Sequence, residues 1–141
     1  MTKLKRVLLV DDCKATNYIH RLVIEKYGCA ESVIEANDGR QALDYLNTPI
    51  DGKYPQPELV FLDINMPVMT GWQFLDEYAK LSADHQAGVV VVMLTTSLNP
   101  DDADLAESKR EVKSFSSKPL TEAKLSEVLQ EHYPHLVKAT D

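Results

Sequence analysis

The sequence predicts an α/β protein in which a doubly wound parallel sheet of five strands is covered by five helices. Five short runs rich in apolar residues predict the strands, and the segments between them are long enough to form helices. Strands that alternate with helices along a chain favour a parallel sheet with helices on both faces. The predicted strands are residues 6–10, 32–36, 59–64, 89–94 and 112–115.

The composition of each run predicts its place in the sheet. Residues 6–10, 59–64 and 89–94 are nearly all apolar, which is typical of strands that are covered on both faces. Residues 32–36 and 112–115 mix polar with apolar side chains. We therefore expect these two strands at the edges of the sheet.

Helix start and stop signals agree with this alternation. Asp38 and Thr70 are each followed three residues later by a glutamine, Gln41 and Gln73, and this spacing is typical of a capped helix start. Gly28 is expected to end the first helix, because glycine readily adopts the left-handed conformation found after many helices.

The length of 141 residues fits one domain, which we expect to span residues 1–133. Residues 134–141 are expected to form a short C-terminal tail without a core face, and we expect no output domain. Residues 47–57 contain three prolines and one glycine, a composition that predicts an exposed loop. This loop precedes the third strand, so we expect it on the side away from the carboxyl ends of the strands.

Charge and cysteine usage narrow the range of partners. The net charge of −7 disfavours general attraction to nucleic acid or to an anionic membrane surface. The apolar run in the first ten residues is too short for a membrane span or a signal sequence. Two isolated cysteines, Cys13 and Cys29, favour a reducing compartment. We expect a cytoplasmic protein that binds neither nucleic acid nor membranes.

Polar residues follow or end four of the predicted strands. Asp11 and Asp12 come after the first strand, Asp63 interrupts the third, Thr95 follows the fourth, and Lys118 lies after the fifth. In open parallel sheets, ligands bind outside the carboxyl ends of the strands. We therefore expect three carboxylates, a hydroxyl and an ammonium group to meet at one edge.

This combination of groups predicts phosphoryl transfer to a carboxylate. Three clustered carboxylates repel one another unless a cation binds among them, and a hard ion such as Mg²⁺ prefers oxygen ligands. One carboxylate oxygen is then able to attack phosphorus, while the metal, Lys118 and Thr95 stabilise the phosphoryl oxygens. Asp63 is the most informative of the three, because a carboxylate that ends the apolar run LVFLDI is out of place in a core strand and needs charged or polar partners.

Four stretches, VLLVDD, LVFLDINMPVMTGW, VVVMLTTS and FSSKP, resemble the receiver domain of two-component response regulators. The similarity extends from about Lys5 to Tyr133 and suggests a single-domain regulator of the chemotaxis type. It implies the flavodoxin-like receiver fold. It also implies a protein that catalyses only its own phosphorylation and dephosphorylation, and so is not an enzyme in the usual sense.

The resemblance implies roles for individual residues. Asp63 corresponds to the phosphoacceptor, and Mg²⁺ or Mn²⁺ is held by Asp12 and Asp63, with Asp11 assisting. The backbone carbonyl of Asn65 corresponds to a third protein ligand. Thr95 and Lys118 correspond to residues that contact the phosphoryl group.

Three further positions have counterparts in the family. Pro119 corresponds to a proline that follows the lysine through a cis peptide bond, and Gly71 to a residue that provides the turn into the third helix. Phe115 occupies the place of the switch aromatic, which moves together with Thr95 and is frequently tyrosine. The movement remodels the face formed by the fourth helix, the fifth strand and the fifth helix, which is the expected contact for an unknown downstream protein.

The predicted function is a stand-alone receiver of a two-component phosphorelay, phosphorylated on Asp63 by a histidine kinase or a histidine phosphotransfer protein. It would signal through protein contacts or pass the phosphoryl group onward. One alternative is a pseudo-receiver that binds partners without phosphorylation. A small phosphatase with an aspartyl nucleophile is the other, but such enzymes usually have a second acid two residues after the nucleophile, where this chain has Asn65.

Overall fold

The protein is described by a computed structural model that covers residues 3–64, 66, 69–81, 90–95, 100–109 and 112–136. Five parallel strands form one sheet in the order β2-β1-β3-β4-β5. The strands are β1 (Leu4–Val10), β2 (Ala30–Ala36), β3 (Leu59–Asp63), β4 (Val90–Thr95) and β5 (Val112–Ser117). The helices are α1 (Lys14–Tyr27), α2 (Gly39–Leu46), α3 (Gly71–Ala79), α5 (Pro100–Ser108) and α6 (Glu122–His132), followed by the 3₁₀ turn η1 (Pro134–Leu136).

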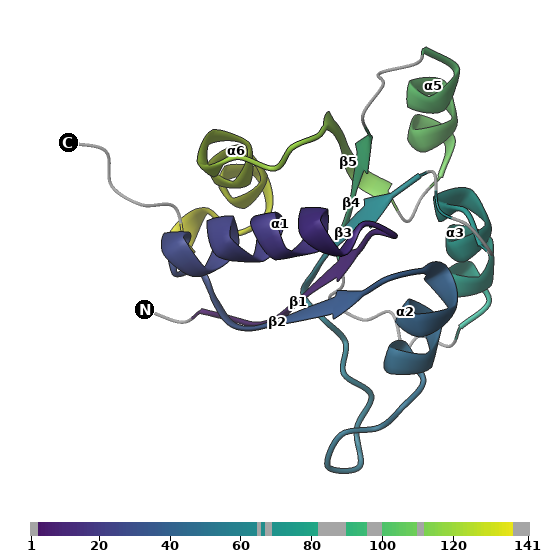
Figure 1. The fold of residues 1–141 in the computed structure, drawn as a ribbon, viewed down its shortest axis with the longest axis horizontal. Coiled ribbons are helices and arrows are strands. Elements are labelled where there is room, and N and C mark those ends of the chain that lie inside the picture. Colours follow the sequence, from purple (N-terminus) through teal and green to yellow (C-terminus); the bar gives the residue numbers. More distant parts are fainter. Residues whose placement is uncertain are drawn as a thin grey trace.

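The helices cover the sheet on both faces (Figure 1). Helices α1 and α6 pack on one face, and α2 and α3 pack on the other. Helix α5 lies beside the edge strand β5, and Lys109, the residue after α5, forms an ion pair of 3.2 Å with Asp76 of α3. The predicted doubly wound parallel sheet is confirmed, and so are the edge positions of β2 and β5.

Two apolar cores explain why the central strands are apolar on both faces. In β1, Val7 and Leu9 point into the core below α1 and α6, while Leu8 and Val10 point into the core below α2 and α3. Successive side chains of a strand point to opposite faces, so all four apolar residues 7–10 of β1 are buried where the strand is covered on both sides. Burying one such side chain stabilises the fold by about 1.5–3 kcal/mol.

The predicted helix ends are found with small differences. The hydroxyl of Thr70 accepts a hydrogen bond from the backbone N–H of Gln73, whose side chain accepts one from the backbone N–H of Thr70. Asp38 caps α2 through the N–H of Gln41, but the Gln41 side chain accepts from Asn37 instead of Asp38. Gly28 ends α1 with a positive φ of 79°, as expected.

The loop 47–57 departs from the expectation of full exposure. Its residues 47–53 are exposed, but Pro55 and Pro57 are buried, and the Pro55 carbonyl accepts a hydrogen bond of 3.2 Å from Arg6. Residues 134–136 were expected to lack a core face, yet Leu136 is buried against the core below α1 and α6. Both segments therefore contact the folded body where they adjoin it.

Within the residues that the structure describes, none of the helices combines the length and the apolar character that crossing a membrane requires.

Candidate functional site

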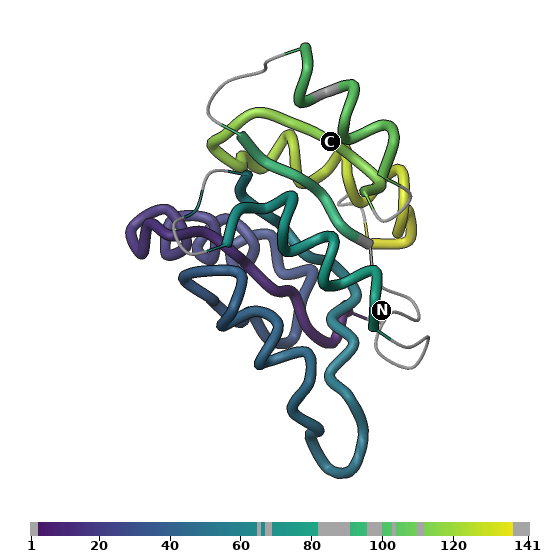
Figure 2. The backbone as a smooth tube through the Cα atoms, turned by 90° about the vertical axis from the view of Figure 1, so that its right-hand side faces the viewer, coloured from purple at the N-terminus to yellow at the C-terminus, as the bar shows by residue number. Residues whose placement is uncertain are grey.

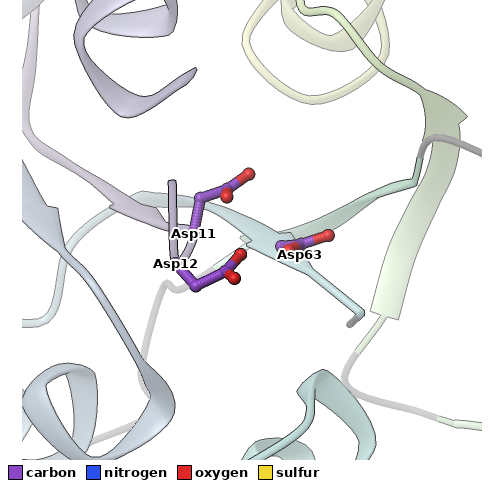
Figure 3. Close-up of side chains that lie close together, drawn as sticks. All are labelled: Asp11, Asp12 and Asp63. Carbon is purple, nitrogen blue, oxygen red and sulfur yellow. The ribbon is translucent and has the colours of Figure 1, made fainter. Parts of the chain in front are cut away.

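Three carboxylates meet at the carboxyl ends of the central strands (Figure 3). Asp11 and Asp12 follow β1, and Asp63 is the last residue of the neighbouring strand β3. One carboxylate oxygen from each residue lies within 4.8 Å of the others. Asp11 and Asp63 are 3% and 6% exposed, whereas Asp12 is exposed to solvent. The expected convergence of these three residues is observed.

The backbone after β1 is held by hydrogen bonds that fix the direction of Asp11. Its N–H donates to the carbonyl of Ala36 at 3.1 Å, and its carboxylate oxygen Oδ1 accepts from the N–H of Cys13 at 2.9 Å. The side-chain amide of Asn17 donates to the carbonyls of Asp11 and Ala36 at 3.0 and 3.1 Å. Helix α1 thus attaches the acidic turn to the end of the edge strand β2.

Lys118 joins two of the three carboxylates. Its ammonium nitrogen lies 2.5 Å from Oδ2 of Asp11 and 3.0 Å from Oδ1 of Asp63, and its side chain is 13% exposed. The backbone N–H of Lys118 donates to the carbonyl of Thr95 at 2.7 Å, which continues the pairing of β4 with β5. The Lys118–Pro119 peptide bond is cis.

Burial and charge act against each other at this site. Burial raises the pKa of Asp63 above its ordinary value; the contact with Lys118 opposes the rise, and the neighbouring Asp11 and Asp12 add to it. For Lys118, burial disfavours the charged form, but the hydrogen bonds to Asp11 and Asp63 outweigh that effect and raise its pKa. Lys118 is therefore charged at neutral pH, and it balances one of three negative charges.

The donor set fits a divalent cation. If the three carboxylates and Lys118 are all ionised, the cluster has an excess of two negative charges in a half-buried setting. Carboxylate oxygens are the ligands that Mg²⁺ prefers, and Mg²⁺ usually binds through one or two protein carboxylates and keeps several waters. Both oxygens of Asp11 already contact protein donors, so Asp12 and Asp63 are the better placed to bind a metal directly.

Gly71 is required at the site for a reason that the sequence did not reveal. It was expected to provide the turn into the third helix, and it is indeed the first residue of α3. Its φ is not in the positive range; instead, a Cβ atom here would lie 2.4 Å from the carbonyl oxygen of Asp63 and 3.0 Å from the Cα of Ile64. The backbone of α3 therefore approaches β3 so closely that no larger residue fits without a shift.

Comparison with known proteins identifies the family. The model of the response regulator receiver domain matches residues 7–130. The chain belongs to this family. The probable methanogenesis regulatory protein FilR2 of Methanothrix harundinacea is 31% identical over 125 residues, which are 89% of this chain and 79% of that protein. The chemotaxis protein CheY of Thermotoga maritima is 30% identical over 127 residues, or 89% of this chain and 94% of CheY.

A solved structure supports the same assignment. The two-component response regulator of Cytophaga hutchinsonii superposes with a TM-score of 0.84 at 28% identity, over 94% of this chain and 99% of that one. Other relatives are longer, and the chain spans between 16% and 66% of their length. The protein is thus a receiver domain of two-component signal transduction. Such domains are typically phosphoacceptors that transmit a signal, and they are not enzymes in the usual sense.

Thr95 and Phe115, the two residues expected to act as the receiver's switch, differ in how deeply they are buried. Thr95 ends β4 and is buried. Phe115 lies in the edge strand β5, where its side chain is partly buried against the core below α2 and α3. The carbonyl of Asn65, expected to be a metal ligand, lies outside the described residues.

Three side chains that hydrogen-bond to the backbone around the site were not singled out as site residues from the sequence. Asn17 and His20 lie one turn apart on the buried face of α1, together with Ile24 and Tyr27. The sequence did contain a signal for Asn17 and His20. Both are polar, although the helical spacing places them on the face of α1 that is expected to be apolar. Lys124 of α6 donates to the carbonyls of the chain segment around Lys118, and nothing in the local sequence distinguishes it from a surface lysine.

Proposed function

We propose that Asp63 accepts a phosphoryl group from the phosphohistidine of a histidine kinase or a histidine phosphotransfer protein, in a reaction that requires Mg²⁺ or Mn²⁺. The observation that supports this most directly is the contact of Lys118 with both Asp11 and Asp63, beside the exposed Asp12. The carboxylate of Asp63, the ammonium group of Lys118 and the carboxylate of Asp12, which would bind the metal, then surround the position where a phosphoryl group would arrive.

Asp63 is the nucleophile in this proposal. A bond forms between a carboxylate oxygen of Asp63 and phosphorus, and the bond from phosphorus to the donor's imidazole nitrogen breaks, with its electron pair leaving on the imidazole. Lys118 already contacts Asp63 at 3.0 Å, so its ammonium group is close enough to neutralise charge on the transferred group. The buried hydroxyl of Thr95 at the end of β4 would donate to a phosphoryl oxygen.

Asp12 and Asp63 would bind the metal directly, and Asp11 would support it from a fixed position. The backbone carbonyl of Asn65 is the third ligand by similarity to the family. When bound, the metal offsets the charge of the carboxylates and polarises the phosphoryl oxygens.

The signal would leave the domain through the face formed by α5, β5 and α6. Thr95 and Phe115 both lie on strands next to this face, so a shift of Thr95 toward the phosphoryl group would open space for Phe115 to move inward. Phe115 has no hydroxyl group, so an inward movement would break no side-chain hydrogen bond. We assign this activity to residues 1–133, and to the cytoplasm because two isolated cysteines in a chain with a normal-sized core favour a reducing compartment.

The test is the intact mass of the protein after incubation with acetyl phosphate, with and without Mg²⁺. We expect one added phosphoryl group only when Mg²⁺ is present. Asp63→Asn should abolish the gain, whereas Asp44→Asn, the same change at an exposed residue of α2, should not affect it. If the folded protein binds Mg²⁺ but gains no mass from acetyl phosphate or from a phosphorylated histidine phosphotransfer protein, it is a pseudo-receiver that acts by contact alone.

A further inference from the structure

His20 connects helix α1 to the segment that carries Lys118. The residue lies on the buried face of α1 and is 2% exposed. Its ring nitrogen Nε2 accepts a hydrogen bond of 3.2 Å from the backbone N–H of Leu120, which is 100 positions later in the chain. Leu120 follows Lys118 and Pro119, so the bond ties down the chain two residues beyond the lysine.

The segment 117–120 is held from three directions, of which His20 provides one. The backbone N–H of Lys118 donates to the carbonyl of Thr95 at 2.7 Å, on the sheet side. From α6, the ammonium group of Lys124 donates to the carbonyls of Ser117 at 2.8 Å and Pro119 at 3.2 Å. His20 supplies the attachment from α1, the helix that also fixes the acidic turn after β1.

The ring of His20 is suited to accepting this hydrogen bond. Burial lowers the pKa of His20; the nearby Asp11 opposes the change, and Lys118 adds to it. The ring is therefore neutral at neutral pH. Because Nε2 accepts from Leu120, the single ring proton belongs on Nδ1. Without an acceptor at position 20, the buried N–H of Leu120 would have no hydrogen-bond partner. Leaving a buried donor unsatisfied costs more folding free energy than the hydrogen bond itself contributes.

We propose that His20 is a positioning residue for phosphorylation: by accepting from Leu120, it holds the segment 117–120 so that Lys118 reaches Asp11 and Asp63 together. This inference rests on the function proposed above for Asp63. Asn17, one turn earlier in α1, holds the acidic turn by donating to the carbonyls of Asp11 and Ala36. Helix α1 therefore sets the distance between the metal-binding acids and the lysine.

The test compares His20→Leu, which has similar bulk but no acceptor, with His20→Gln, whose side-chain oxygen can replace Nε2. At saturating Mg²⁺ and acetyl phosphate, we expect His20→Leu to lower the phosphorylation rate about tenfold, equivalent to about 1.4 kcal/mol. His20→Gln should remain within about threefold of the wild type. His135→Leu, the same change at an exposed histidine, should leave the rate unchanged.

A second measurement separates positioning from general damage. The affinity for Mg²⁺, measured by calorimetry, should not be weaker in His20→Leu than in the wild type, because Asn17 still holds the turn at Asp11 and a displaced Lys118 leaves more negative charge for the metal. The nitrogen spectrum of the wild-type imidazole should show the proton of His20 on Nδ1. This result does not depend on how well any variant folds.

Several results would overturn the assignment of His20. They are a wild-type rate in His20→Leu, an equal loss in both variants, Mg²⁺ binding weakened in parallel with the rate, or a ring proton on Nε2. A wild-type protein that takes up no phosphoryl group would overturn the proposed function as well. Uptake by the wild type with an unchanged rate in His20→Leu would overturn only the role of His20.

Discussion

Replacing Lys118 with methionine should destabilise the metal-free protein strongly and the Mg²⁺-bound protein much less. The methionine side chain has similar length and no charge, so the change removes the ammonium group with little loss of volume. Asp11 and Asp63, which contact Lys118 at 2.5 and 3.0 Å, are then left buried without a cation. A bound Mg²⁺ ion restores positive charge in the same place.

The size of the effect follows from the geometry. At 3 Å and an effective dielectric constant of about 20, two unit charges attract by about 5 kcal/mol. Measured losses on removing one partner of a buried ion pair are about 3–5 kcal/mol, because the remaining charge stays desolvated. We expect a loss in this range, which is a large part of the roughly 5–15 kcal/mol by which most domains are stable.

Urea unfolding in EDTA and in Mg²⁺ measures both parts of this prediction. With a slope of about 2 kcal/mol per molar urea, a loss of 3–5 kcal/mol lowers the midpoint by about 1.5–2.5 M. In the wild type, Mg²⁺ at 100 times its dissociation constant adds about 2.7 kcal/mol. The variant should gain more than the wild type at the same Mg²⁺ concentration, since its site has one more uncompensated negative charge.

The control is Lys80→Met, which removes an exposed ion pair of 3.2 Å with Glu77 and should change stability by less than about 0.5 kcal/mol. The reasoning is refuted if Lys118→Met loses less than about 1 kcal/mol in EDTA. It is equally refuted if Mg²⁺ stabilises the variant and the wild type by the same amount.

Three further predictions concern the surroundings of the site. Gly71→Ala should cost about 1–3 kcal/mol in urea unfolding, because its Cβ would meet the backbone of Asp63, whereas Gly39→Ala should cost less because only a flexible methionine side chain stands in the way. In metal-free buffer, Asp63→Asn should raise stability at neutral pH: the raised pKa of Asp63 means that ionisation costs more in the folded state. That gain should shrink as the pH falls through the folded and then the unfolded pKa, and a constant difference from pH 3 to 8 would contradict it. Thr70→Ala should cost about 1 kcal/mol, and Thr70→Ser should restore most of it, unless the observed capping box contributes nothing in solution.

The sheet and the acidic cluster could be predicted because both depend on rules that apply within each strand. Side chains alternate along a strand, so a run that is nearly all apolar indicates burial on both faces, as in the apolar stretches of β1, β3 and β4. Carboxyl ends of neighbouring parallel strands lie together whatever the loops between them do. That rule alone was enough to predict that Asp11, Asp12 and Asp63 lie close together.

The supporting contacts could not be predicted, because they depend on how helices pack on the sheet. The hydrogen bond from Leu120 to His20 joins residues 100 positions apart and requires a particular placement of α1. Likewise, the close approach of Gly71 to Asp63 depends on the position of α3, and a glycine at a helix start gives no sign of it. The burial of Leu136 against the core below α1 and α6, and the contact of Arg6 with the carbonyl of Pro55, also depend on tertiary packing.

The loop 47–57 has a practical consequence of its own. It precedes β3 and projects from the body of the protein (Figures 1 and 2), at the opposite end of that strand from Asp63. Its tip, around Gly52, is exposed. Lengthening a flexible loop costs little, since each doubling of its length adds only about 0.6 kcal/mol. The tip is therefore a suitable attachment point for a fluorescent label or a surface tether in single-molecule experiments, with the reactive end of the domain left open to its partners.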